Sequence, residues 1–194
     1  MFPSLFIIKN VDIIRWHISC IQGYTSMFNK KIIQEIADTL ISRQQTIAVA
    51  ESVTAGFLQA ALASAENASA FFEGGLTAYN INQKYVHLHI DLTHAINCNC
   101  VSEQIAFEMA KGVARTFSSN WAIGITGYAT PVPGYNMHKL HACYAIVSDQ
   151  NIISTSSIIT DIQEAEEVQL KYVDKVLEAL RELVVKELQK EKAG

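Results

Sequence analysis

Ser52 stands where a strand is expected to give way to a helix, and that position invites a chemical role. The segment from Thr46 to Ala50 is apolar and rich in β-branched residues, which is typical of a short buried strand. Glu51, Ser52 and Thr54 follow this segment directly. Backbone N–H groups at the start of a helix are unpaired and attract anions and polar ligands. Ser52 can therefore be a helix cap, a phosphate contact or a nucleophile.

A serine needs a base before it can attack, and the sequence offers a lysine and a tyrosine for that task. No histidine is well placed near Ser52 by sequence. A lysine that is buried can have its pKa lowered enough to act as a base, and a tyrosine can relay the proton. Ser52, Tyr79 and Lys84 would form such a set, with the Ser52 Oγ atom in hydrogen-bond reach of the Lys84 amine or the Tyr79 hydroxyl. The alternative, which residue types alone favour, is an N-cap serine, a core tyrosine and a surface lysine.

The apolar patterns predict alternating strands and helices that would position these residues. We expect strands at 46–50, 73–79, 121–126, 140–148 and 151–159. We expect helices at 29–43, 54–65, 81–88, 102–117 and 163–190, with Ser102 as an N-cap and an irregular stretch at 90–101. This order predicts an α/β fold with a mixed sheet in a single domain.

Polar residues end three of the expected strands, and such ends tend to converge on one edge of an α/β sheet. They lie in the segments 51–54, 74–84 and 124–130. The turns at 54–56 and 126–127 could each present backbone N–H groups to an anion. The chain has neither a P-loop nor a glycine-rich dinucleotide motif.

The composition indicates a globular chain that can bury a real core. It is 49% hydrophobic and 18% charged with a net charge of −4, which argues against a nucleic-acid partner. No apolar run is long enough to span a membrane, so no membrane partner is expected. The spacing of Cys20, Cys98, Cys100 and Cys143 does not match a zinc site, which predicts reduced thiols, no metal and a cytoplasmic location.

The first 26 residues look unlike the rest of the chain. They contain apolar clusters but neither a transmembrane span nor the basic start and cleavage site of a signal peptide. Helical spacing of apolar residues begins only after Met27. We expect residues 1–26 to be an N-terminal extension outside the domain, and residues 27–194 to form the domain itself.

Four motifs taken together resemble the CinA C-terminal domain family. They are AESVTAG, FFEGGLTAYN with NQK behind it, VSEQIAFEMAKGVA and WAIGITGYATP, and the resemblance runs from about Phe28 to Glu187. It implies a three-layer α/β/α sandwich. It also implies hydrolysis of the carboxamide of nicotinamide mononucleotide to nicotinate mononucleotide and ammonia, without a cofactor or metal. The partner would be this small-molecule pyridine nucleotide.

The resemblance also implies roles for individual residues. Ser52 matches the nucleophilic serine of the family, Tyr79 and Lys84 match the residues that assist it, and Thr126 matches a threonine near the substrate. We expect the following residues at the strand ends to bind the substrate: Glu51, Thr54, Gly56, Asn80, Thr126 and Gly127.

The chain departs from the family pattern in the expected pocket walls. Val53 and Ala55 replace a cysteine and a glycine, the glycine-rich stretch becomes 128–134, and His141 adds bulk where the family keeps room for the ligand. A second interpretation is therefore a CinA-like module that binds a nucleotide or a partner protein without turnover. A third is a plain structural domain with a helix capped at Ser52. The apolar face of the last helix is expected to cover the sheet, but it could also serve a homo-oligomer contact.

Overall fold

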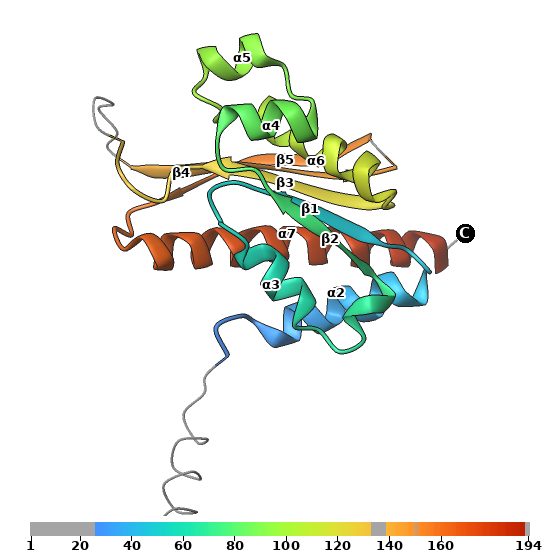
Figure 1. Cartoon of the computed structure of the whole chain (residues 1–194). Coiled ribbons are helices and arrows are strands. Elements are labelled where there is room, and N and C mark those ends of the chain that lie inside the picture. Colours follow the sequence, from blue (N-terminus) through green and yellow to red (C-terminus); the bar gives the residue numbers. More distant parts are fainter. Residues whose placement is uncertain (1–25, 133–138, 150, 193–194) are drawn as a thin grey trace, which may run out of the picture.

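A mixed five-stranded sheet lies between two layers of helices in the computed structural model, which describes residues 26–132, 139–149 and 151–192 (Figure 1). The strands follow the order β2-β1-β3-β4-β5. They are β1 (Ile47–Glu51), β2 (Phe72–Thr77), β3 (Trp121–Gly127), β4 (Leu140–Ser148) and β5 (Asn151–Thr160). The first three in space are parallel, and β4 and β5 are antiparallel to their neighbours. The expected α/β/α sandwich with a mixed sheet is confirmed. The N-terminal extension expected at residues 1–26 lies outside the described ranges except for Ser26.

Helices cover both faces of the sheet. Below it in Figure 1 lie α2 (Lys30–Ser42), α3 (Phe57–Ala63) and α7 (Ala165–Lys192), with a short 3-10 turn at Ala68–Ala70 after α3. Above it lie α4 (Ile81–Leu88), α5 (Leu92–Asn97) and α6 (Glu103–Phe117). Within the described ranges, no helix combines the length and apolar character that crossing a bilayer requires.

The alternation of β1 divides the core into two clusters. Ile47 and Val49 point into the large apolar cluster that includes side chains from α2, α3 and α7. Ala48 and Ala50 point the other way, into the cluster built on α6. The small side chains on this second face let α6 lie close to the sheet, and close packing of this kind maximises dispersion contacts.

The helix after β1 begins at Phe57, three residues later than the apolar pattern predicts. Ala55 and Gly56 have φ angles of 52° and 102°, both in the left-handed region, so a right-handed helix cannot include them. Glycine adopts this region without strain, but alanine does so at a cost of about 1–2 kcal/mol. The turn at Ala55 is therefore a strained feature next to Ser52.

The stretch expected to be irregular contains the short helix α5. The Asp91 side chain accepts a hydrogen bond of 3.0 Å from the His94 N–H and so caps the helix, which the periodicity alone did not reveal. The expected N-cap of α6 is confirmed, because Ser102 Oγ accepts from the Ile105 N–H at 3.1 Å. Both caps fix the chain that borders one side of the site.

Candidate active site

The carboxyl ends of the three parallel strands meet at one edge of the sheet, as the sequence predicts. Glu51 of β1 lies opposite Thr77 of β2 and Ile125 of β3, so the residues that follow these strands emerge side by side. They border a cavity of about 610 Å³. Cavities of this size at strand ends are where α/β proteins place ligands.

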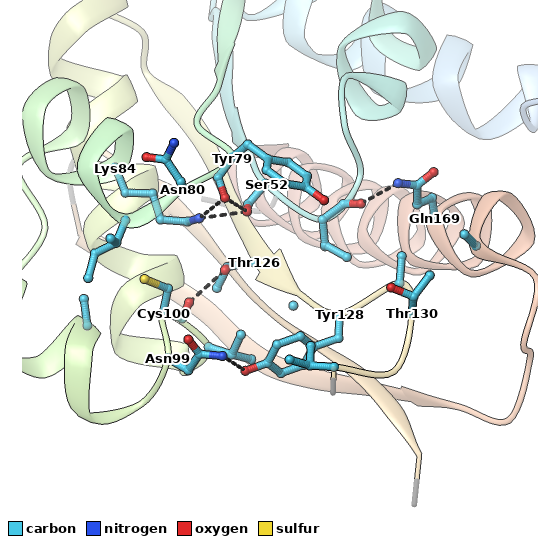
Figure 2. A pocket seen from close by; sticks show the side chains of 18 of the residues that line it. Ser52, Tyr79, Asn80, Lys84, Asn99, Cys100, Thr126, Tyr128, Thr130 and Gln169 are labelled. Carbon is cyan, nitrogen blue, oxygen red and sulfur yellow. Dashed lines mark hydrogen bonds between the residues drawn. The ribbon is translucent and has the colours of Figure 1, made fainter. Parts of the chain in front are cut away.

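Lys84 and Ser52 are in direct contact at the inner wall of the cavity (Figure 2). The Lys84 Nζ atom lies 2.8 Å from the Ser52 Oγ atom. Lys84 is only 2% exposed, so it is not the surface lysine of the alternative interpretation. Nor is Ser52 the cap of α3, whose N-cap residue is Gly56.

Helix α4 holds Lys84 in this position. The side chain of Asn80, which caps the helix, accepts a hydrogen bond of 3.0 Å from the Gln83 N–H. Lys84 and Leu88 form the buried side of the helix, while Tyr85 and Val86 are exposed. The start of α4 after β2 therefore determines where the lysine amine lies.

Burial lowers the pKa of Lys84, because a charged ammonium is poorly solvated there, while the nearby Cys100 raises it to a smaller extent. Burial in turn raises the pKa of the Cys100 thiol, which the positive charge of Lys84 partly offsets. A lysine with a lowered pKa is more often neutral, and a neutral amine can accept a proton. Neutral Lys84 can therefore accept the proton of the Ser52 hydroxyl.

Tyr79 contributes its backbone to the pair and not its hydroxyl. Its carbonyl oxygen accepts hydrogen bonds from Lys84 Nζ at 3.1 Å and from Ser52 Oγ at 3.4 Å. The side chain is 75% exposed, and Figure 2 shows the hydroxyl directed away from Lys84. The structure thus supports neither a proton relay through the Tyr79 hydroxyl nor a core tyrosine.

Glu51 is fully buried behind Ser52 and holds the start of α3. Its carboxylate accepts from the backbone N–H groups of Gly56, Leu58 and Gln59 at 2.9–3.1 Å, and from the Thr54 hydroxyl at 2.5 Å. It does the work of a cap for a helix whose N-cap glycine has no side chain, and its negative charge suits a helix N-terminus. Glu51, Thr54 and Gly56 do not line the cavity and therefore support Ser52 from behind, which differs from the expected substrate contacts.

Asn80, Thr126 and Gly127 do line the cavity, where the sequence placed them. The Thr126 hydroxyl donates a 2.8 Å hydrogen bond to the Cys100 carbonyl and so ties the loop after α5 to the end of β3. A Cβ atom on Gly127 would lie 2.5 Å from the Cα atom of Ala142, so β4 can approach only a glycine. Thr126 therefore shapes the wall through a side-chain hydrogen bond, and Gly127 through close backbone packing.

The lining of the cavity also includes Tyr128, from the altered stretch, and polar residues that the sequence did not single out for the site, among them Asn99, Cys100 and Gln169. Asn99 Nδ2 donates to the Tyr128 hydroxyl at 2.8 Å. Gln169 Nε2, on α7, donates to the Val53 carbonyl at 2.9 Å, across 116 positions of sequence. A contact between such distant residues leaves no local pattern in the chain.

His141 does not border the cavity, contrary to the expectation that it narrows the ligand space. Its ring lies against the ring of Tyr128 with centroids 5.4 Å apart and planes at 72°. The bulk of His141 therefore supports the wall from behind. Residues 133 and 134 of the altered stretch lie outside the described ranges.

The cysteines near the site are free thiols, as are all those in the described part of the chain: Cys98, Cys100 and Cys143. In the part of the chain that the structure describes, no group of three or more histidine, cysteine or acidic side chains could hold a metal ion.

The fold and the site together define an α/β protein with a buried serine–lysine pair at the carboxyl edge of its sheet. The family model of the CinA C-terminal domain matches residues 29–184, and the chain belongs to this family. A CinA-like protein of Prochlorococcus marinus is 32% identical over 164 residues, which cover 79% of this chain and 39% of that protein. A CinA-like protein of Picosynechococcus is 44% identical over 96 residues, covering 50% and 23%.

Solved structures show the same fold. The competence damage-inducible protein A of Klebsiella pneumoniae is 26% identical with a TM-score of 0.71, covering 79% of this chain and 94% of that one. The competence or damage-inducible protein of Enterobacter asburiae is 25% identical with a TM-score of 0.74, covering 80% and 97%. By contrast, the chain spans only 23–39% of the length of the first curated relatives.

Proposed function

We propose that the protein is an amidohydrolase that converts the carboxamide of nicotinamide mononucleotide to the carboxylate and releases ammonia. The observation that carries the chemistry is the 2.8 Å contact between Ser52 Oγ and the buried amine of Lys84. The substrate comes from the resemblance of the chain to nicotinamide-nucleotide amidohydrolases among CinA proteins. Serine–lysine pairs of this kind are a known variant of the serine nucleophile with an adjacent base.

The reaction proceeds in two halves through Ser52. Neutral Lys84 takes the hydroxyl proton as Ser52 Oγ forms a bond to the carboxamide carbon. The resulting ammonium then protonates the amide nitrogen, the C–N bond breaks, and ammonia leaves behind an ester on Ser52. In the second half, Lys84 takes a proton from water as the water oxygen bonds to the ester carbon. The Lys84 ammonium then gives this proton to Ser52 Oγ as the bond between Oγ and the acyl carbon breaks, and the acid leaves and loses its remaining proton to become the carboxylate.

The turn after Ser52 supplies donors for the negative oxygen that forms in each half. In the described part of the chain, the backbone N–H groups of Val53 and Thr54 donate to no acceptor. The N–H of the residue after the nucleophile is a common oxyanion donor in acyl transfer. Gln169 holds the Val53 carbonyl at 2.9 Å and so keeps this turn in place.

The remaining residues have supporting roles in this proposal. The Tyr79 carbonyl orients the Lys84 amine toward Ser52, and Glu51 with Thr54 and Gly56 fixes the turn that carries Ser52. Asn80, Thr126 and Gly127 form the cavity wall against which the substrate lies. The last three are therefore the proposed substrate contacts.

The test is ammonia release from nicotinamide mononucleotide, measured together with the carboxylate product. We expect the two products in equal amounts from the wild type, and a loss of at least about a thousandfold in Ser52→Ala. Ser69→Ala, at an exposed serine on the 3-10 turn, is the matched control and keeps full activity. Equal rates for the wild type and Ser52→Ala would refute the proposal.

The strained turn next to Ser52 favours a second candidate, a module that binds the nucleotide without turnover. Ala55 has a φ angle of 52° in a motif where the family usually has glycine, so the geometry of the oxyanion turn depends on a strained alanine. In this case nicotinamide mononucleotide would raise the melting temperature of both the wild type and Ser52→Ala, and neither would release ammonia.

A further inference from the structure

The ring of Tyr128 forms a wall of the cavity, and Figure 2 shows it across the cavity from Ser52 and Lys84. Tyr128 follows β3 directly, in the stretch where the chain departs from its family pattern. Tyr79 and Tyr128 both bring an aromatic side chain to the cavity of the serine–lysine pair, but Tyr79 is 75% exposed whereas Tyr128 is half-buried.

Contacts at both ends of the residue hold Tyr128 in place. Its backbone N–H donates to the His141 carbonyl at 2.9 Å, and its own carbonyl accepts from the Tyr172 hydroxyl at 3.1 Å. Its phenol oxygen accepts from Asn99 Nδ2 at 2.8 Å, and its ring packs edge to face with the ring of His141. A ring fixed in this way loses little conformational entropy when a ligand lies against it.

The charges around the cavity leave the aromatic ring as the group that suits a cation. Lys84 is the basic side chain among the described residues that line the cavity, and none of those residues is acidic. An N-substituted pyridinium carboxamide carries a positive charge in its ring. The face of an aromatic ring attracts a cation through its quadrupole, more strongly when water is excluded.

We propose that Tyr128 is the specificity-determining residue that stacks on the pyridinium ring of the substrate. It thereby selects cationic N-substituted pyridinium carboxamides over neutral pyridine carboxamides. This inference rests on the proposed function for the identity of the ring, but it concerns binding and not the bond-breaking steps. It also explains why a tyrosine occupies position 128, where the chain departs from the glycine-rich family pattern.

The test compares two ligands that differ by one methyl group and one positive charge, N1-methylnicotinamide and nicotinamide. Their affinities are measured by calorimetry in the Ser52→Ala background, where no turnover interferes. We expect tighter binding of the cation, and a loss of about five- to thirtyfold for the cation in Tyr128→Leu. Tyr128→Phe keeps the preference because it keeps the ring. Tyr85→Leu, at a half-exposed tyrosine that does not line the cavity, is the matched control and changes neither affinity.

A ring-fluorinated phenylalanine at position 128 provides a second test that does not depend on the folding of Tyr128→Leu. Fluorination withdraws charge from the ring face at nearly constant shape, so the affinity for the cation falls while that for nicotinamide does not. Equal affinities for the two ligands in the Ser52→Ala protein, or a cation affinity unchanged by Tyr128→Leu or by fluorination, would overturn the inference. Absence of ammonia release by the wild type would overturn the proposed function alone.

Discussion

Lys84 Nζ lies 2.8 Å from Ser52 Oγ, although the two residues are 32 positions apart in the chain and one follows a strand while the other lies on a helix. Ser52 follows β1, and Lys84 lies on the buried side of α4, which follows the neighbouring strand β2. The parallel pairing of β1 and β2 brings both elements to the same edge. The contact therefore depends on the topology of the sheet and on the cap of α4.

Replacing Lys84 with an apolar residue of similar length separates activity from stability. We expect Lys84→Met to lower kcat/KM by about a hundred- to ten-thousandfold because the base is lost. The free energy of unfolding should stay equal or rise by up to about 2 kcal/mol, since a buried amine no longer has to be desolvated. Urea unfolding near neutral pH checks this, with Lys31→Met at an exposed position as the control. A large loss of stability in Lys84→Met would contradict the account.

The activity should depend on pH through the same lysine. Burial lowers the pKa of Lys84 below its usual 10.5, and only the neutral amine can act as the base. We therefore expect kcat/KM to rise with pH, with the midpoint of the rise below 10.5, and to level off above that midpoint. Between the folded and unfolded pKa values the unfolded chain binds more protons, so the wild type also gains stability with rising pH. Lys84→Met should lose both trends, and a wild-type rate that falls over this range would contradict the role of Lys84.

Glu51 should matter for stability and for activity without touching the substrate. In Glu51→Gln an amide group replaces an oxygen that accepts from the backbone N–H groups at the start of α3, so a buried donor faces other donors. We expect a loss of about 2–3 kcal/mol in the free energy of unfolding. We also expect a fall in kcat of about tenfold as Ser52 shifts. The control Glu73→Gln, at an exposed position of β2, should change neither the free energy of unfolding nor kcat. If Glu51→Gln also left both quantities unchanged, the cap would be unimportant.

The strained turn predicts a stabilising substitution. Ala55 is exposed and has a φ angle of 52°, which glycine adopts without a steric penalty. Ala55→Gly should therefore raise the free energy of unfolding by about 1 kcal/mol. Ala60→Gly, at an exposed position inside α3, should lower it by about 1 kcal/mol, so the two variants differ in sign. Losses of equal size in both variants would show that Ala55 is not strained.

Much of the fold follows from local sequence patterns, because those patterns act over a few residues. The strands are apolar runs, and Ser102 caps α6 through a hydrogen bond three residues away. The start of α3 could not be predicted in the same way. An alanine does not predict a left-handed turn, and the turn at Ala55 is stabilised by the hydrogen bond from the Gly56 N–H to the Glu51 carboxylate.

The site was predictable where residue type decides the chemistry and not where the backbone does. Ser52 and Lys84 were singled out by their side chains, and the structure brings them together. Tyr79 was singled out for its hydroxyl, but its carbonyl makes the contact, and a carbonyl is common to every residue. Gln169 reaches the cavity through the long-range packing of α7, which local spacing does not encode.

The most direct test of the account is to look for the ester on Ser52. The wild type is mixed with nicotinamide mononucleotide, quenched in acid within the first turnovers, digested and analysed by mass spectrometry. We predict an acyl adduct on the peptide that contains Ser52 in the wild type, and neither adduct nor ammonia release in Ser52→Ala. Ammonia release that persists in Ser52→Ala, with no adduct on the wild-type peptide at any quench time, would contradict the account.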